Sequence, residues 1–340
     1  MFRIQPAITS LALVLAAGCS VGYGSHARIS ALREASSAPR AGTPPAAAAL
    51  PAPAELGSQL RAVNRAIYSE QLVSFRYVVE SLGERLEIHR VSAADVGRTL
   101  VWDLQESAYA PAARAEGPAE AIRVVLYAID STTGLPAAPL VEIGTIDMYP
   151  QNAMISGPQS KLTMRYVVSG RGADQTTYAD FTGVDGGREC SHCARVAGWL
   201  TDGTTRVEFA ASYAVVAGAV RFTATERVAS QPGVLRLDAT LEDSSMHSAA
   251  RFMFHGDSLE SRALLIRGDD GTDDGTFAVR LNGRPFLDAD RDLITIMGPQ
   301  NRALTPDEDV ATRQLYALTY GLVEYVEMPA FLTFNCGCAQ

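Results

Sequence analysis

The stretch Leu235–Glu242 reads LRLDATLE and decides the fold class. Apolar and polar side chains alternate along it, which is the two-residue period of a β-strand with one buried and one wet face. The same period recurs at residues 206–211 and 220–225. Short turn clusters such as Asp202-Gly203 and Asn282-Gly283 separate these runs, without helix-length crossovers. The pattern therefore predicts an antiparallel meander of roughly eight to ten strands between residues 162 and 297.

Upstream of the meander, the sequence predicts a helix, an ambiguous segment and a hairpin. Leu56, Leu60, Val63 and Ile67 recur at helical spacing, which indicates an amphipathic helix. Residues 73–79 fit either a strand or a helix ending at Gly83, and their β-branched and aromatic residues favour the strand. A return strand would then hold Leu86 and Ile88. Strands at 122–129 and 140–148, joined by turn residues, predict a hairpin with a broad loop.

A second helix is predicted near the end of the chain. Thr305-Pro306-Asp307-Glu308 has the pattern of a capping box, with proline at the first helical position. An apolar stripe then follows, and Pro329 stops it. A helix apolar over so much of its surface is usually buried, so we expect it to cover the sheet, the alternative being an exposed helix that binds a partner. The members of the stripe are Leu315, Leu318, Leu322 and Val326.

These elements predict a mainly β protein with flanking helices, in the α+β class. The meander would form a curved sheet, a half-barrel or a sandwich, with the apolar C-terminal helix packed on it. We expect an N-terminal helix and hairpin region at 55–150 and the meander, helix and cysteine-rich tail at 151–340. The two regions can also form one domain. A chain of 340 residues with 47% hydrophobic content has enough material for a large core.

Net charge restricts the partners. The chain carries a formal charge of −9 and has a pI near 5.1, which argues against nucleic acid and against a polybasic membrane patch. No nucleotide-binding motif stands out. We therefore expect neither nucleic acid nor nucleotide as a ligand, and no cofactor.

The first 18 residues have the layout of a processed leader. Arg3 precedes an apolar core, and small residues then lead to Cys19. The apolar run is too short for a membrane-spanning helix, which needs about 20 residues. The stretch Leu15-Ala16-Ala17-Gly18-Cys19 resembles the signal of bacterial lipoproteins, although Ala16 stands where leucine is commonest. An ordinary signal peptide is the alternative.

The lipoprotein resemblance implies an address and an anchor. In that family the cysteine thiol, here of Cys19, receives a diacylglycerol and becomes the new N-terminus. Ser20 stands where an aspartate would mark inner-membrane retention, so the resemblance implies the outer membrane, with the body facing the periplasm or the cell surface. Two or more acyl chains make a durable anchor. Residues 19–54 are rich in Ala, Pro and Ser, which predicts a flexible tether.

Four further cysteines are expected to form disulfides. They are Cys190, Cys193, Cys336 and Cys338, and they allow three pairings. Exported proteins keep such bonds. Two alternatives are a redox motif at Cys190-Ser191-His192-Cys193, whose flanks lack the expected βαβ pattern, and a zinc site made of the four thiolates.

Metal and catalytic motifs are weak. Asp288, Asp290 and Asp292 give a calcium-like spacing, but the glycine and glutamate of a calcium-binding loop are missing, so we interpret them as solvated turn residues. His255, Asp257 and Ser258 are sequence neighbours, whereas a catalytic triad needs groups that converge in space. We interpret them as a capped loop and predict no enzyme activity.

Two function classes follow from the sequence. The first is a non-enzymatic, lipid-anchored envelope protein whose β body serves structure or protein contact. The alternative is a lipoprotein carrier or chaperone that encloses an apolar ligand between sheet and helix. A carrier needs a cavity of roughly 300 Å³ or more, whereas a structural body is packed solid.

Overall fold

The fold is known from a computed structural model. It describes residues 49–75, 78, 96–113, 117–130, 133, 135–151, 163–171, 176–185, 193–217, 219–229, 231, 233–242, 245–267, 273–290 and 302–319. The leader, Cys19 and most of the predicted tether lie outside these residues. Among the described residues no helix is long and apolar enough to cross a bilayer.

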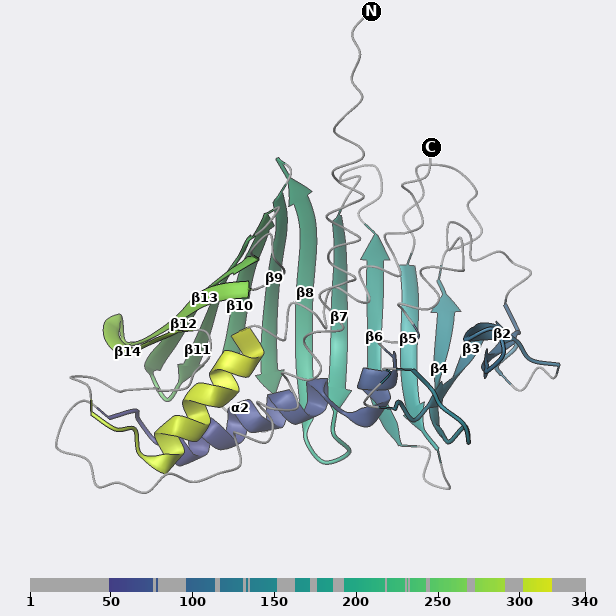
Figure 1. Ribbon diagram of the computed structural model, residues 1–340, viewed down its shortest axis with the longest axis horizontal. Helices are drawn as coiled ribbons and strands as arrows, with labels where there is room; N and C mark the ends of the chain where they lie inside the picture. The colour runs from purple at the N-terminus through teal and green to yellow at the C-terminus, as the bar shows by residue number, and fades with distance from the viewer. Residues whose placement is uncertain are drawn as a thin grey trace, which may run out of the picture.

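One open sheet of 14 strands forms the body (Figure 1). Its strands follow the order β14 to β3 without a crossover and end in β1 and β2. The strands are β1 Thr99–Asp103, β2 Ala108–Pro111, β3 Ile122–Tyr127, β4 Glu142–Pro150, β5 Thr163–Gly170, β6 Thr177–Asp185, β7 Cys193–Thr201, β8 Arg206–Val216, β9 Ala219–Val228, β10 Val234–Glu242, β11 Ser245–Phe254, β12 Asp257–Arg267, β13 Asp273–Leu281 and β14 Arg284–Asp290.

The predicted meander is confirmed. β5 to β14 are ten consecutive antiparallel strands between residues 163 and 290. The three runs with the clearest alternation are β8, β9 and β10, and the predicted hairpin is β3 and β4. The sheet is mixed because β1 pairs with β3 in parallel, which the sequence did not indicate. Strands from both predicted regions share this single sheet, which excludes the two packed sheets of a sandwich.

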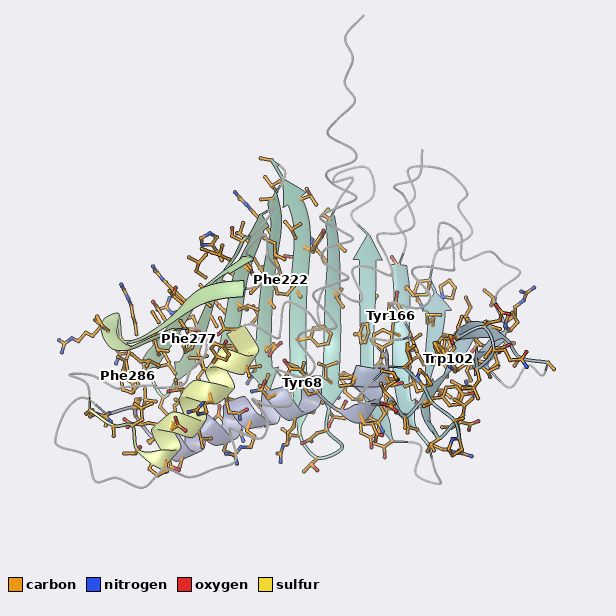
Figure 2. All side chains as sticks on the ribbon, in the orientation of Figure 1. Tyr68, Trp102, Tyr166, Phe222, Phe277 and Phe286 are labelled. Atoms are coloured by element: carbon orange, nitrogen blue, oxygen red, sulfur yellow. The ribbon has the colours of Figure 1, made fainter. Side chains whose placement is uncertain are left out.

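One face of the sheet, here called the inner face, carries the core. A row of facing residues crosses it from β4 to β12, and each member lies opposite the next in the strand register. Figure 2 labels three large buried side chains along this sheet, Tyr166, Phe222 and Phe277. The row consists of Met148, Tyr166, Phe181, Gly198, Phe209, Glu226, Leu235, Phe252 and Leu259.

Helix α2, Pro53–Ile67, and a helix near the end of the described chain pack against this face. The predicted first helix is confirmed as α2, whose buried side includes Leu56, Leu60 and Val63. It contacts β7, β8 and β9 (Figure 1). Residues 306–319 form a second helix beside it, joined to α2 where the Asn64 amide donates to the Gln314 side chain at 2.6 Å.

The preferred strand at 73–79 was wrong over its described residues. Residues 70–75 are helical, and Phe75 is buried against Tyr166 and Phe181 with ring centroids about 6 Å away. An aromatic residue can pack on a sheet from a helix as well as from a strand. Here the packing of Phe75 on the sheet, and not its strand propensity, determined the secondary structure. Leu86 and Ile88 lie outside the described residues.

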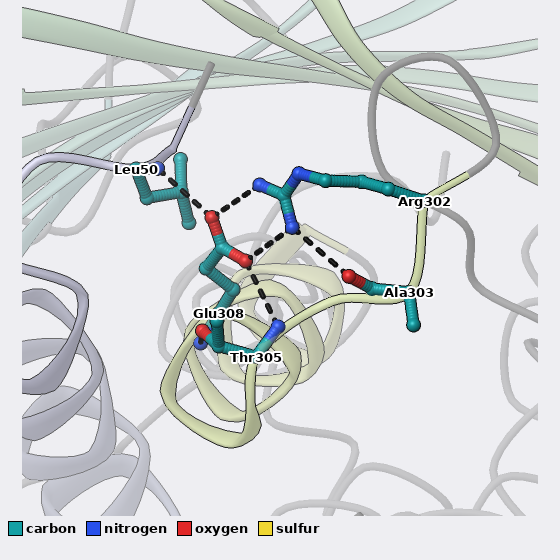
Figure 3. Close-up of polar contacts among 5 residues, drawn as sticks. All are labelled: Leu50, Arg302, Ala303, Thr305 and Glu308. Atoms are coloured by element: carbon teal, nitrogen blue, oxygen red, sulfur yellow. Dashed lines mark hydrogen bonds and ion pairs between the residues drawn. The ribbon is translucent and has the colours of Figure 1, made fainter. Parts of the chain in front are cut away.

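The second helix begins as the capping box requires. Glu308 Oε2 accepts the backbone N–H of Thr305 at 2.9 Å, and the Glu308 N–H reaches Thr305 Oγ1 at 3.3 Å (Figure 3). Its described part buries polar side chains such as Thr312 and Thr319 beside Leu315 and Leu318, so its burial is less apolar than the stripe predicted. The predicted continuation to Pro329 lies outside the described residues.

Candidate functional site: the outer face of the sheet

The face of the sheet opposite the core, here called the outer face, meets solvent. Along β9 the residues Phe222, Ala224, Glu226 and Val228 are buried, and those between them are exposed. The same alternation runs through β8 and β11. Since an antiparallel sheet needs cover on one face only, this pattern leaves a broad polar surface available for contacts.

Aromatic rings and charged groups gather on the outer face of β4 to β8. We call this set the aromatic–arginine cluster, and it consists of Tyr149, Arg165, Asp180, Trp199 and Arg206. The Arg206 guanidinium lies 4.5 Å from the centre of the Trp199 ring. The Arg165 guanidinium lies 5.9 Å from the Tyr149 ring. Both rings are half-buried, so part of each remains accessible.

Hydrogen bonds fix the cluster. Arg165 donates to both carboxylate oxygens of Asp180, at 2.9 and 2.7 Å. These bonds from Arg165 hold the pKa of the Asp180 carboxyl below its ordinary value, although partial burial opposes them. The strand register explains the arrangement, because Trp199 on β7 lies directly between Asp180 on β6 and Glu208 on β8. Cross-strand neighbours on one face lie about 5 Å apart, close enough for such contacts.

The inner face carries a small hollow in its described part. The hollow, at the β11–β13 end, is lined by Leu50, Leu56, Phe252, Phe254 and other residues, and it measures about 10 Å³. That volume suits about one water molecule. It is far below the roughly 300 Å³ that a carrier of small apolar molecules needs.

An isolated carboxyl lies within the inner face. Glu226 is buried between Phe209 and Leu235, its facing neighbours in the register. Its Oε2 has no hydrogen-bond partner in the described part of the chain. Burial raises the pKa of Glu226 to about 8. The carboxyl is therefore mostly protonated at neutral pH, which removes the cost of burying a charge. The predicted strand stopped at residue 225, so sequence reasoning missed Glu226, although the alternation continues to it.

Most predicted cysteine sites fall outside the described residues. This holds for Cys19, Cys190, Cys336 and Cys338. Cys193 is described and half-buried at the start of β7, opposite Ala214 of β8. Lipidation and disulfide formation therefore remain predictions.

The predicted solvated turn at the calcium candidates was wrong for two of them. Asp288 and Asp290 belong to β14, where they pair with Ala278 and Thr276 of β13. Asp292 lies outside the described residues. The turn lies earlier in the chain, at Asn282-Gly283, which joins β13 to β14, so the residues that follow it belong to a strand. Among described residues no three or more His, Cys, Asp or Glu side chains gather as a metal site.

The three neighbours His255, Asp257 and Ser258 do not converge. His255 lies at a positive φ of 48° in the β11–β12 turn and meets Glu55 of α2 at 3.2 Å. Asp257 accepts a hydrogen bond from Asn282, and the Ser258 hydroxyl accepts one from Arg251. Each side chain has a different partner. Only His255 lies in the predicted loop, because Asp257 and Ser258 begin β12.

The aromatic–arginine cluster was not predicted from the sequence. Its residues come from five strands, and only the register brings them together. The available signal was that Trp199 and Arg206 flank the predicted turn at Asp202-Gly203, which places them near each other across a hairpin. No protein-family model, curated protein or solved structure matches the chain.

Proposed function

We propose that the chain is a lipid-anchored, non-enzymatic interaction protein of the cell envelope, and that the outer face of its sheet is the surface that binds a partner protein. The observation that carries the proposal is the stack of Arg206 on Trp199 at 4.5 Å, in a half-exposed aromatic–arginine cluster. Tyrosine, tryptophan and arginine are the residues most enriched at the energetic centres of protein interfaces.

The geometry of the cluster supports a binding role. The contacts of Arg165 with Asp180 and Tyr149 fix the orientation of its guanidinium before any partner arrives. A partner then has less side-chain entropy to remove on binding. Rigid strands also position the rings more firmly than loops would.

The remaining parts of the proposal rest on the sequence and on the inner face. The stretch 15–19, which resembles a lipoprotein signal, supports anchoring through Cys19 at the outer membrane. The hollow of about 10 Å³ on the inner face is too small for the ligand of a carrier, which supports an interaction protein over a carrier.

Site-specific photo-crosslinking in the producing cells tests this proposal. A photoreactive amino acid replaces Ala197, which is exposed on β7 two residues from Trp199 on the same face. Ser58, exposed on α2, provides the control position. We expect a discrete protein adduct from position 197, and none of that mass from position 58.

A double variant makes the test specific for the cluster. Replacing Trp199 and Arg206 by alanine should remove the adduct at position 197 while the protein still reaches the membrane and melts normally. An adduct that survives the double variant, or that forms equally from position 58, would contradict the proposal.

A further inference from the structure

A second part of the outer face, over β9 to β13, presents arginines that have no partner. We call it the arginine surface. Each of its arginines is exposed, and none makes an ion pair or a side-chain hydrogen bond within the described part of the chain. They are Arg221, Arg227, Arg236, Arg262 and Arg280.

The register brings the positive charges together. Arg236 lies directly opposite Arg251 on the same face, an arrangement that costs free energy because like charges repel. Within the surface, Arg251 forms an ion pair with Glu260 at 3.3 Å. Arg280 lies opposite the same Glu260 without forming an ion pair to it. One carboxylate therefore faces two arginines from neighbouring strands.

The surface is positive although the chain is acidic. By the strand register, the outer positions of β9 to β13 hold six arginines, the five above and Arg251, against four acids, Asp238, Glu242, Glu260 and Asp274, so the local charge is six minus four, or +2. The whole chain has a formal charge of −9. A patch of one sign on a protein of the opposite sign attracts a complementary surface and speeds its encounter.

The shape of the patch indicates what it binds. Ala249 and Ala278 lie next to Arg262 on the outer face, and their small side chains leave the guanidinium groups accessible. Guanidinium groups bind carboxylates through two parallel hydrogen bonds. Neighbouring strands place such groups about 5 Å apart, which suits carboxylates spaced along a folded protein.

A membrane or a nucleic acid suits the patch less well. Membrane-surface patches combine basic residues with long apolar or aromatic side chains that insert between lipids. Here alanine and threonine lie between the arginines, and the exposed apolar side chains of the surface, Met253 on β11 and Ile266 on β12, lie near its opposite ends and form no continuous apolar patch. Nucleic acid would meet repulsion from a chain with a pI near 5.1.

We infer that the arginine surface docks an acidic, carboxylate-rich surface of a partner protein. This inference rests on the proposed function and adds the chemistry of the partner. It places the acidic contact on β9 to β13, beside the aromatic–arginine cluster of β4 to β8.

Binding of poly-L-glutamate to the full chain, followed by fluorescence anisotropy at increasing salt, tests the inference. The variant Arg221→Gln, Arg236→Gln, Arg262→Gln removes three unpaired arginines. The matched control Arg61→Gln, Arg65→Gln, Arg171→Gln removes three exposed arginines elsewhere. We expect the first variant to raise the Kd about tenfold and the control less than about twofold, since each exposed ion pair contributes only modestly to binding. Unchanged circular dichroism and melting confirm that both variants fold.

Two results would overturn the inference. An equal rise in Kd for both triple variants would mean that poly-L-glutamate responds to the total charge of the protein and does not prefer this surface. Tighter binding to phosphatidylglycerol vesicles or to duplex DNA than to poly-L-glutamate, lost in the first variant, would assign the surface to a membrane or a nucleic acid. If the adduct at position 197 forms normally while poly-L-glutamate fails to bind, this inference fails and the proposed function stands.

Discussion

Glu308 accepts a hydrogen bond at 3.0 Å from the backbone N–H of Leu50, which lies 258 positions earlier in the chain. The same carboxylate receives two hydrogen bonds from Arg302, at 2.6 and 2.7 Å (Figure 3). All three residues are buried. One side chain thus caps a helix, neutralises a buried arginine and fixes the entry of the chain into the fold.

The first prediction concerns this carboxylate. Glu308→Ala should lower the free energy of unfolding by about 3 kcal/mol or more, because it removes the carboxylate that neutralises the buried Arg302 charge. Chemical denaturation measures the change. Glu260→Ala, which breaks the exposed pair with Arg251, is the control and should cost less than about 1 kcal/mol.

The effect of Glu308→Ala should depend on pH. Burial alone would raise the pKa of Glu308, but hydrogen bonds from Arg302 and from the N–H groups of Thr305 and Leu50 outweigh it and hold the pKa below its ordinary value. A carboxyl whose pKa is lower in the folded state stabilises the protein at pH values above its pKa in the unfolded state. This stabilisation is lost as the pH falls through its pKa in the folded state. The difference in free energy of unfolding between wild type and variant should therefore become smaller in acid. A difference that stays constant with pH would contradict this role of Glu308.

The second prediction has the opposite pH dependence and concerns Glu226. Its folded pKa of about 8 exceeds its ordinary value of 4.5, so its contribution to stability is present in full below pH 4.5 and is lost as the pH rises through 8. The free energy of unfolding should fall by roughly 3 to 5 kcal/mol across this range, at about 1.4 kcal/mol per pKa unit.

Glu226→Gln should remove that slope, because the amide cannot ionise. Melting temperatures from pH 5 to pH 8.5 provide the measurement. Glu208→Gln is the matched control, since Glu208 is exposed on the neighbouring strand and should leave the slope intact. A wild-type slope that persists in Glu226→Gln would show that other groups cause it.

The third prediction compares two glycines. A Cβ on Gly198 would lie 2.2 Å from the backbone oxygen of Asp180, so β6 and β7 would have to move apart. Gly198→Ala should cost about 1 to 3 kcal/mol. A Cβ on Gly57 in α2 would meet Val310 at an ordinary 3.4 Å, so Gly57→Ala should be neutral or stabilise by up to about 1 kcal/mol. Equal costs for the two substitutions in urea denaturation would refute this account of the packing.

The fourth prediction concerns the proposed anchor. Cys19→Ser should move the protein from the membrane fraction to the soluble fraction, because it removes the thiol that the acyl group would occupy. Intact mass spectrometry of the native protein, before and after reduction, should find a lipid adduct on Cys19 and two disulfides among the other four cysteines. Membrane attachment that survives Cys19→Ser would exclude this anchor.

Local patterns predicted the repetitive part of the fold. The strands β8, β9 and β10 could be predicted without information from distant residues, because the alternation within each strand identifies its buried face. The capping box at Thr305 and Glu308 is equally local and was confirmed. The parallel contact of β1 with β3 was beyond reach, because nothing in either strand specifies it.

The candidate site depended on long-range register and was largely unpredictable. Arg165 and Asp180 meet because β5 and β6 pair with a particular offset, and a shift of one residue would turn one of them to the core. Residues 73–75 show the same limit, since the β-branched and aromatic residues of 73–79 favoured a strand, whereas Phe75 packs on Tyr166 from a helix.

Hydroxyl-radical footprinting of Trp199 tests most directly the central claim that a partner protein covers the outer face in the cell envelope. The oxidation rate of Trp199 is compared between intact envelopes and the purified protein, with Leu104, an exposed turn residue, as the internal reference. We predict that Trp199 reacts several times more slowly in envelopes while Leu104 reacts at the same rate in both. Equal rates for Trp199 in the two samples would contradict the claim.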